Sequence, residues 1–283
     1  MAMLHVTLVL VALAITHVAG FIRGTVRHRS KALKHSVGCE VRVYEDSALL
    51  EEAVAKDFVD VARTSISDNG KFTAAVPGGS VLKMLRALVP IKDEIDWSKV
   101  FLYFVNHKIV PASDAGGTHT KGLDLFINAC GIPGDNQFAP SLEADGLSKE
   151  EHAAIYSAHI NKHVAVNAEG LPEFDYMLIG SGSDGHIGSL YPGRDEVKYE
   201  GNDEWTLGVD KKDPPSISLS LPVMNAAKNI RVVMTGESKV ETVTKGVMKL
   251  EAKEDFPVCG VKSEVWLIDE AAAGGLDEHL DDT

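Results

Sequence analysis

Short apolar runs alternate with amphipathic segments through most of this chain, and this alternation restricts its possible folds most strongly. Residues 100–105 (VFLYFV) and 176–179 (YMLI) carry no charge, as expected of parallel strands that are buried on both faces. The segment after Ser47 instead places apolar residues at helical spacing and is closed by Asn69 and Gly70. This alternation over about 230 residues predicts a single α/β domain, with three layers (α/β/α) and a mainly parallel, Rossmann-like sheet.

The hydrophobic pattern also gives bounds for the elements. We predict strands at residues 41–44, 72–76, 100–105, 176–179, 216–221, 230–234 and 265–268. We predict helices at residues 47–69, 81–88, 120–129, 149–164 and 239–250, the first of them capped by Ser47. The domain is expected to span residues 39–270, followed by an acidic, flexible tail at 271–283 that lacks lysine and arginine.

The first 38 residues are predicted to be a removable address. Residues 6–16 form an apolar run that is too short to cross a bilayer, which needs about 20 helical residues. Small residues follow this run, so we interpret residues 1–20 as a signal peptide. Residues 21–38 contain basic and hydroxyl side chains and no acidic one, which is typical of an organelle transit peptide.

Together, the two N-terminal segments resemble the bipartite presequences of algae with complex plastids. We therefore expect a plastid location reached by the secretory route, with the secretory pathway or the ER lumen as the alternative. Removing residues 1–38 would take the formal net charge from −13 to about −18. We expect no nucleic-acid partner, because so acidic a domain repels polyanions. Cys39, Cys130 and Cys259 are odd in number and lack metal-ligand spacing, so no disulfide is required.

The densest group of candidate functional residues lies in residues 174–193 (FDYMLIGSGSDGHIGSLYPG). There an apolar strand stops at a turn with three glycines in six positions, which lets the backbone approach a ligand closely. Asp184 and His186 flank Gly185, so the turn presents an acid and an imidazole at a strand end, where open α/β sheets bind ligands. A plain connector is the alternative, but the titratable pair favours a site.

Two other junctions between a strand and a helix are suited to an anion. Gly78, Gly79 and Ser80 offer backbone N–H groups and a hydroxyl at the start of a predicted helix. Lys239 stands at the start of another helix, where its charge opposes the helix dipole, which favours an anionic ligand nearby. An ordinary turn and a solvated lysine are the alternatives, and these residues alone do not decide between them.

Five segments, in this order, are similar to the successive motifs of the 6-phosphogluconolactonase family: residues 75–88, 95–98, 174–193, 221–227 and 235–243. The resemblance covers about residues 40–270, and the wider superfamily includes glucosamine-6-phosphate deaminases with a similar glycine-rich turn. It implies a three-layer Rossmann-type fold that needs neither a metal nor a nucleotide cofactor. It also implies hydrolysis of 6-phosphogluconolactone to 6-phosphogluconate in the oxidative pentose phosphate pathway.

The resemblance assigns roles to individual residues. His186 falls on the family's general base, which takes a proton from the water that attacks the lactone carbonyl, and Asp184 would orient its ring. An imidazole suits this role because its ordinary pKa is about 6.5. The residues expected to bind the substrate or its phosphate are Gly78, Gly79, Ser80, Lys108, Gly182, Gly185, Arg194 and Lys239.

Several positions depart from the family pattern. The family's Asp-Glu-Arg after the VFLYFV strand is Asn106-His107-Lys108 here, and Lys108 keeps the positive charge without the bidentate fork of arginine. Ser216 stands where an arginine usually opens the next strand, and losing a phosphate-clamping arginine costs about 1.5–3 kcal/mol. Arg194 is the candidate to compensate for that loss.

Three functions stay open. The first is lactone hydrolysis. The second is a weakened or inactive homologue that binds a sugar phosphate or another protein, and the third is an amino-sugar phosphate isomerase or deaminase. That last chemistry needs a carboxylate base where Asn106 stands. His152, His159 and His163 are spaced along a predicted helix without an HExxH motif, so we predict no metal site. We expect a small sugar-phosphate ligand, no stable membrane association after processing, and a monomer or homodimer.

Overall fold

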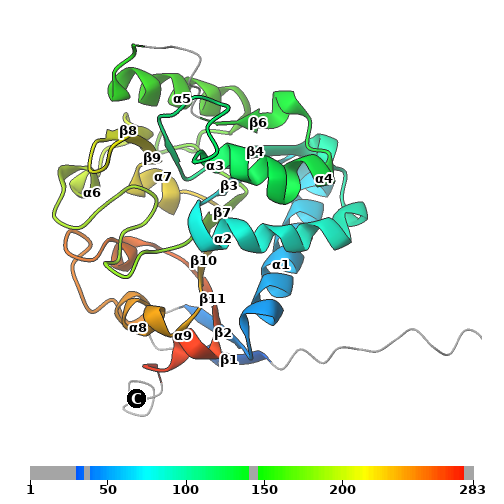
Figure 1. Ribbon diagram of the computed structural model, residues 1–283, viewed down its shortest axis with the longest axis vertical. Coiled ribbons are helices and arrows are strands. Elements are labelled where there is room, and N and C mark those ends of the chain that lie inside the picture. The colour runs from blue at the N-terminus through cyan, green and yellow to red at the C-terminus, as the bar shows by residue number, and fades with distance from the viewer. Residues whose placement is uncertain (1–29, 35–38, 140–145, 277–283) are drawn as a thin grey trace, which may run out of the picture.

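A mostly parallel sheet of eight strands, flanked by helices on both faces, forms the body of the single domain (Figure 1). The computed structural model describes residues 30–34, 39–139 and 146–276. The strand order is β1-β2-β11-β10-β7-β3-β4-β6, and only the edge strand β1 runs antiparallel to its neighbour. A smaller antiparallel sheet has the order β5-β9-β8. The predicted fold class is confirmed.

The strands are β1 (Ser30–Lys34), β2 (Glu40–Tyr44), β3 (Phe72–Val76), β4 (Val100–Phe104), β5 (Asn106–Lys108), β6 (Gln137–Phe138), β7 (Tyr176–Ile179), β8 (Thr206–Val209), β9 (Ser216–Leu219), β10 (Ile230–Met234) and β11 (Val265–Asp269). The α-helices are α1 (Ser47–Asn69), α2 (Gly79–Met84), α3 (Thr118–Gly122), α4 (Asn128–Cys130), α5 (Lys149–His163), α6 (Asp195–Lys198), α7 (Leu221–Asn225), α8 (Val240–Met248) and α9 (Glu270–Ala273). Short 3-10 or π segments complete the helical layers, among them η1 (Leu85–Glu94), η3 (Leu123–Ile127) and η5 (Glu237–Lys239).

The sheet is buried on both faces because successive side chains of its strands point into two separate cores. Ala75 and Tyr103 pack into the core beneath α5, α7 and α8, whereas Ala74 and Leu102 pack into the core beneath α1 and α2. Figure 1 shows these two helical layers on opposite sides of the sheet. Burial on both faces explains why the strands appear in the sequence as unbroken apolar runs.

The first helix begins and ends at local signals, one of which differs from the prediction. Gly70 closes α1 in the left-handed conformation (φ 74°), as the Asn69-Gly70 pair predicts. The cap at the other end is Asp46 and not Ser47, because the Asp46 carboxylate accepts hydrogen bonds from the backbone N–H groups of Ala48 and Leu49. Ser47 is the first helical residue.

The folded part of the chain extends beyond both predicted domain boundaries. Strand β1 lies within residues 21–38 and pairs with the whole length of β2, from Ser30 opposite Tyr44 to Lys34 opposite Glu40. At the other end, Leu276 is buried in the core, so the acidic tail cannot begin at residue 271. The predicted signal peptide and residues 277–283 lie outside the described residues. Within the described ranges, no helix is long and apolar enough to cross a membrane.

Strands β3 and β7 meet at the point where the chain direction across the sheet reverses. The chain passes from β3 to β4 on one side and later returns to β7 on the other. Asp175 ties the starts of these two strands together, because its carboxylate accepts hydrogen bonds from the backbone N–H and the hydroxyl of Thr73, both at 2.9 Å. Ligands of open α/β sheets bind beyond the carboxyl ends of strands at such a reversal.

Candidate active site

A pocket of about 430 Å³ opens at the carboxyl ends of β3, β4, β7 and β10. Its lining includes most of the predicted site residues: Gly78, Gly79, Ser80, Asn106, Lys108, Gly182, His186, Ser216 and Lys239. These residues come from segments that are far apart in the sequence. The sheet reversal therefore brings the three predicted motifs into one concave site.

The His186 ring is held by the neighbouring carboxylate. His186 Nδ1 lies 2.5 Å from Asp184 Oδ1, and the same oxygen accepts the His186 backbone N–H at 3.2 Å. Burial raises the pKa of Asp184, but its hydrogen bonds with the His186 side chain and backbone outweigh this, so the pKa is lowered overall. Because an ionised carboxylate only accepts, this contact places the imidazole proton on Nδ1 and leaves Nε2 with a free lone pair.

Two glycines shape this turn. A Cβ at Gly182 would lie 2.2 Å from His186 Nδ1, so the imidazole packs where any larger residue would put its side chain. Gly185 has φ +81°, a conformation that other residues rarely adopt, and a Cβ there would also strike the Phe256 ring. Gly182 lines the pocket, whereas Gly185, which was also predicted to bind substrate, does not line it and lies against the Phe256 ring.

The two predicted anion-binding junctions face the same pocket. Gly78 and Gly79 form the turn into α2, and Ser80 is exposed beside them. The ammonium of Lys239 donates to the Ser181 carbonyl at 2.8 Å. Burial lowers the Lys239 pKa, and the nearby charge of Asp184 opposes that effect.

Strand β5 carries the three residues that depart from the family pattern. Asn106 donates from Nδ2 to Ser189 Oγ at 3.0 Å, so its amide is fixed in the pocket wall. His107 is 2% exposed; its Nδ1 lies 2.6 Å from the Lys108 carbonyl, and its Nε2 accepts the His119 backbone N–H. Burial lowers the His107 pKa to about 4, so this ring is neutral near pH 7 and supports the wall.

Ser216 and Lys108 are direct cross-strand neighbours. Their Cα atoms pair where β9 runs antiparallel to β5, and both residues line the pocket. Side chains of paired residues lie on the same face of a sheet. A positive charge therefore remains beside the position of the missing arginine.

Arg194 does not line this pocket. Its guanidinium pairs with Glu196 at 2.8 Å and with Asp210 at 2.6 Å. Two carboxylates already neutralise its charge, so the structure gives no support to Arg194 as a replacement for an arginine at Ser216. Pro192 and Gly193 separate it from Tyr191, which does line the pocket.

Several lining residues were not among the predicted site residues, including Lys121, Ser189, Tyr191 and Lys212. The Tyr191 ring lies 4.7 Å from the His186 ring, centroid to centroid. The position of Tyr191 soon after the glycine-rich turn was a sequence signal that could have predicted its place in the pocket. Lys121 and Lys212 lie outside every motif, and only the folded chain brings them to the site.

The three helical histidines do not form a metal centre. His163 packs against the rings of Phe101 and Phe138, each at 4.9 Å between centroids. His159 Nδ1 is buried without a hydrogen-bond partner, and burial lowers the His159 pKa. Within the ranges that the structure describes, no group of three or more histidine, cysteine, aspartate or glutamate residues could hold a metal ion.

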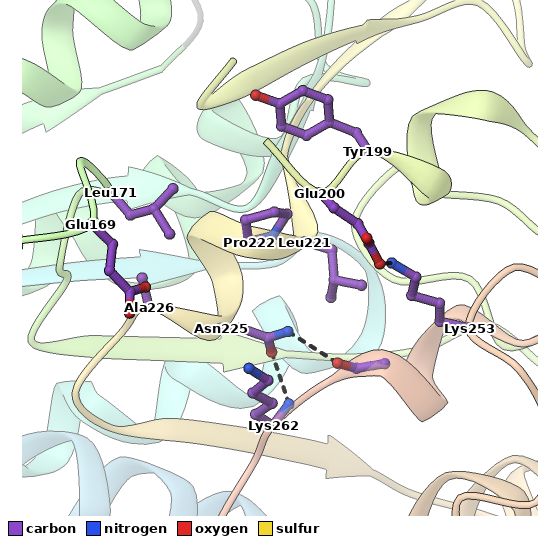
Figure 2. A pocket seen from close by; sticks show the side chains of 11 residues that line it. Glu169, Leu171, Tyr199, Glu200, Leu221, Pro222, Asn225, Ala226, Lys253 and Lys262 are labelled. Carbon is purple, nitrogen blue, oxygen red and sulfur yellow. Dashed lines mark hydrogen bonds and ion pairs between the residues drawn. The ribbon is translucent and has the colours of Figure 1, made fainter. Parts of the chain in front are cut away.

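A second pocket, of about 420 Å³, contains none of the predicted site residues (Figure 2). Two of its charged residues, Lys253 and Glu200, form an ion pair, and the Asn225 amide bonds the Gly260 carbonyl and the Lys262 backbone N–H. These contacts join α7 to the loop before β11. They indicate a structural junction.

The fold and the site define an α/β protein with a lysine-lined pocket at a sheet reversal and a histidine–aspartate pair beside it. The chain belongs to the glucosamine-6-phosphate isomerase/6-phosphogluconolactonase family, whose model matches residues 45–268. It is 31% identical over 248 residues to 6-phosphogluconolactonase 3, chloroplastic, of Arabidopsis thaliana, covering 83% of this chain and 75% of that protein. It is 30% identical over 262 residues to probable 6-phosphogluconolactonase 2 of Oryza sativa subsp. indica, covering 86% of this chain and 92% of that protein.

A solved structure supports the fold independently. The 6-phosphogluconolactonase from Trypanosoma brucei superposes with a TM-score of 0.70 and 23% sequence identity, covering 83% of this chain and 98% of that one. At this level of identity the likeness concerns the fold.

Proposed function

We propose that this protein hydrolyses 6-phosphogluconolactone to 6-phosphogluconate, the lactonase step of the oxidative pentose phosphate pathway. The observation that carries the proposal is the 2.5 Å contact between His186 Nδ1 and Asp184 Oδ1 at the edge of a pocket rich in lysine. The names of the similar plant proteins support the same activity.

In the proposed mechanism, His186 Nε2 accepts a proton from a water molecule as the water oxygen attacks the lactone carbonyl carbon. The tetrahedral intermediate then collapses, and the bond between that carbon and the ring oxygen breaks. The imidazolium returns its proton to the departing ring oxygen, which becomes a hydroxyl. The new carboxylic acid ionises in water, so one proton is released in each turnover. Asp184 holds the ring and stabilises its transient positive charge.

The phosphate of the substrate is proposed to lie against the turn of Gly78, Gly79 and Ser80, with Lys239 beside it. Backbone N–H groups and a hydroxyl supply directional donors, and the ammonium supplies charge. Lys108 provides a second cation from the β5 wall. Together these groups offset the strong negative charge of the whole chain, −13, at the one place where an anion must bind.

The isomerase or deaminase alternative has less support from the site. Moving a carbon-bound proton requires a base, and Asn106 is a neutral amide that donates to Ser189 Oγ. A binding protein without catalytic activity remains the competing outcome, since Ser216 and Lys108 both weaken the expected phosphate clamp.

We also infer a plastid location, reached by the secretory route. The chloroplastic names of similar plant proteins and the composition of residues 1–38 support it. A reporter fused to residues 1–38 should enter the plastid, whereas one fused to residues 21–38 alone should not enter the secretory route. A reporter with residues 1–38 that stays in the cytosol would contradict this inference.

The activity is tested by following the lactone and its product with phosphorus NMR, which separates them from other phosphates. The protein should accelerate conversion above the spontaneous rate in buffer, and the only phosphorylated product should be 6-phosphogluconate. If the lactone disappears no faster with the protein than in buffer alone, the proposed activity is wrong, and a binding protein without catalytic activity is the remaining alternative.

A further inference from the structure

Lys212 is a pocket cation with no assigned role. It lies in the exposed segment before β9, and its side chain makes no ion pair with another described residue. Its Nζ instead lies 5.1 Å from the centroid of the Tyr191 ring. An aromatic face attracts an ammonium without neutralising it, so Lys212 keeps its charge and its N–H donors available.

This cation is placed beside the candidate base. The Tyr191 ring contacts Lys212 and also lies 4.7 Å from the His186 ring, so lysine, tyrosine and histidine form one continuous wall. Of the other pocket lysines, Lys239 donates to the Ser181 carbonyl and Lys121 to the Gly116 carbonyl, whereas Lys108 stands on the β5 wall, away from Tyr191 in the sequence. Lys212 is therefore freer than Lys239 or Lys121 to change partner when an anion enters.

We propose that Lys212 is a specificity-determining residue that binds the phosphate of the substrate from the Tyr191 side of the pocket. The ligand identity rests on the proposed function, but the role of Lys212 does not require catalysis. Asp213 is the one acidic residue among the described lining residues. The carboxylate of Asp213 opposes anion binding, so Lys212 must contact the phosphate directly to favour binding.

The test compares full-length wild type with Lys212→Ala, Lys212→Arg and Lys211→Ala. Lys211 is the matched control because it is an exposed neighbour of the same charge that does not line the pocket. Hydrolysis is measured with 6-phosphogluconolactone and with gluconolactone, which lacks the phosphate. Calorimetry measures binding of 6-phosphogluconate and gluconate.

For Lys212→Ala we expect kcat/KM on the phosphorylated lactone and affinity for 6-phosphogluconate to fall about tenfold or more. Values for the ligands without phosphate should change less than about twofold. Lys211→Ala should resemble wild type, and Lys212→Arg should retain most of the binding. Equal losses with and without the phosphate would mean that Lys212 only supports Tyr191, and would overturn the proposal. Equal effects of Lys211→Ala and Lys212→Ala would also overturn it.

The calorimetry separates this proposal from the proposed function. If wild type hydrolyses neither lactone but binds 6-phosphogluconate about tenfold more tightly than Lys212→Ala does, the role of Lys212 stands and the catalytic assignment fails. If wild type neither hydrolyses 6-phosphogluconolactone nor binds 6-phosphogluconate, both fail.

Discussion

His186 and Asp184 form a preorganised pair in which one carboxylate oxygen meets both the ring Nδ1, at 2.5 Å, and the backbone N–H of His186, at 3.2 Å. These hydrogen bonds hold the pKa of Asp184 below its ordinary value, although partial burial raises it. A carboxyl with a depressed folded-state pKa contributes stability above its unfolded-state pKa and loses it only as the pH falls through the folded value. The pair is therefore intact at neutral pH, where the imidazole has to be oriented.

Replacing Lys239 is expected to weaken substrate binding more than turnover. Lys239→Ala removes a charge that would contact the phosphate equally in the ground state and the transition state. We expect KM for 6-phosphogluconolactone to rise about 10- to 100-fold, with kcat changed much less. Steady-state kinetics over a range of substrate concentrations check this. A fall in kcat at unchanged KM would instead place Lys239 in the chemical step.

His107 should make stability depend on pH in mildly acidic solution. Burial lowers its folded-state pKa to about 4, below the ordinary value, so the unfolded chain binds a proton first as the pH falls. Stability from the neutral ring is complete above about pH 6.5 and is lost progressively towards pH 4, to a total of about 3 kcal/mol.

The check on His107 is chemical denaturation of wild type and His107→Asn at several pH values. The asparagine does not titrate, so the advantage of wild type in unfolding free energy should shrink between pH 6.5 and 4. An advantage that stays constant over this interval would show that His107 is not buried as a neutral ring.

Restoring the family residues on β5 should strengthen the site. In Asn106→Asp the carboxylate can accept a hydrogen bond from the Ser189 hydroxyl, which now accepts from the amide. In Lys108→Arg a planar fork replaces a point charge. We expect the double variant to raise kcat/KM about tenfold. Each single variant serves as a control, and a double variant no better than wild type would show that these departures do not limit activity.

The pairing of β1 with β2 predicts where the chain can be shortened. A protein that begins at Ser30 keeps all five pairs between these strands, whereas one that begins at Cys39 leaves β2 as an open sheet edge. We expect the shorter protein to lose about 1–3 kcal/mol of unfolding free energy in denaturant titrations. Equal stability of the two proteins would show that β1 adds nothing to the sheet.

The positions of the central strands were predictable because parallel strands that are buried on both faces appear in the sequence as unbroken apolar runs. The bounds of β3 and β7 agree with the predicted residues 72–76 and 176–179. Strands β5 and β6 were missed because they have three and two residues, too few for any periodicity to emerge.

The site was predictable only where local chemistry marks it. The glycines around Asp184 and His186 are a local signal of this kind, because a Cβ at Gly182 or Gly185 would clash with neighbouring side chains. Lys212 has no local signal, since it reaches the pocket through the packing of its loop against Tyr191. Arg194 was predicted to face the pocket because it follows the glycine-rich turn. Its ion pair with Asp210, which is distant in the sequence, could not be predicted from the residues around it.

The proposed role of His186 as the general base is tested most directly by hydrolysis of 6-phosphogluconolactone by wild type and by His186→Ala, with the spontaneous rate subtracted. The side chain of His186 is 28% exposed at the pocket, so its removal should leave the protein folded, as circular dichroism can verify. We expect an active wild type and a variant whose kcat is lower by a factor of about 10²–10⁴. A folded variant that hydrolyses the lactone as fast as wild type would contradict this role.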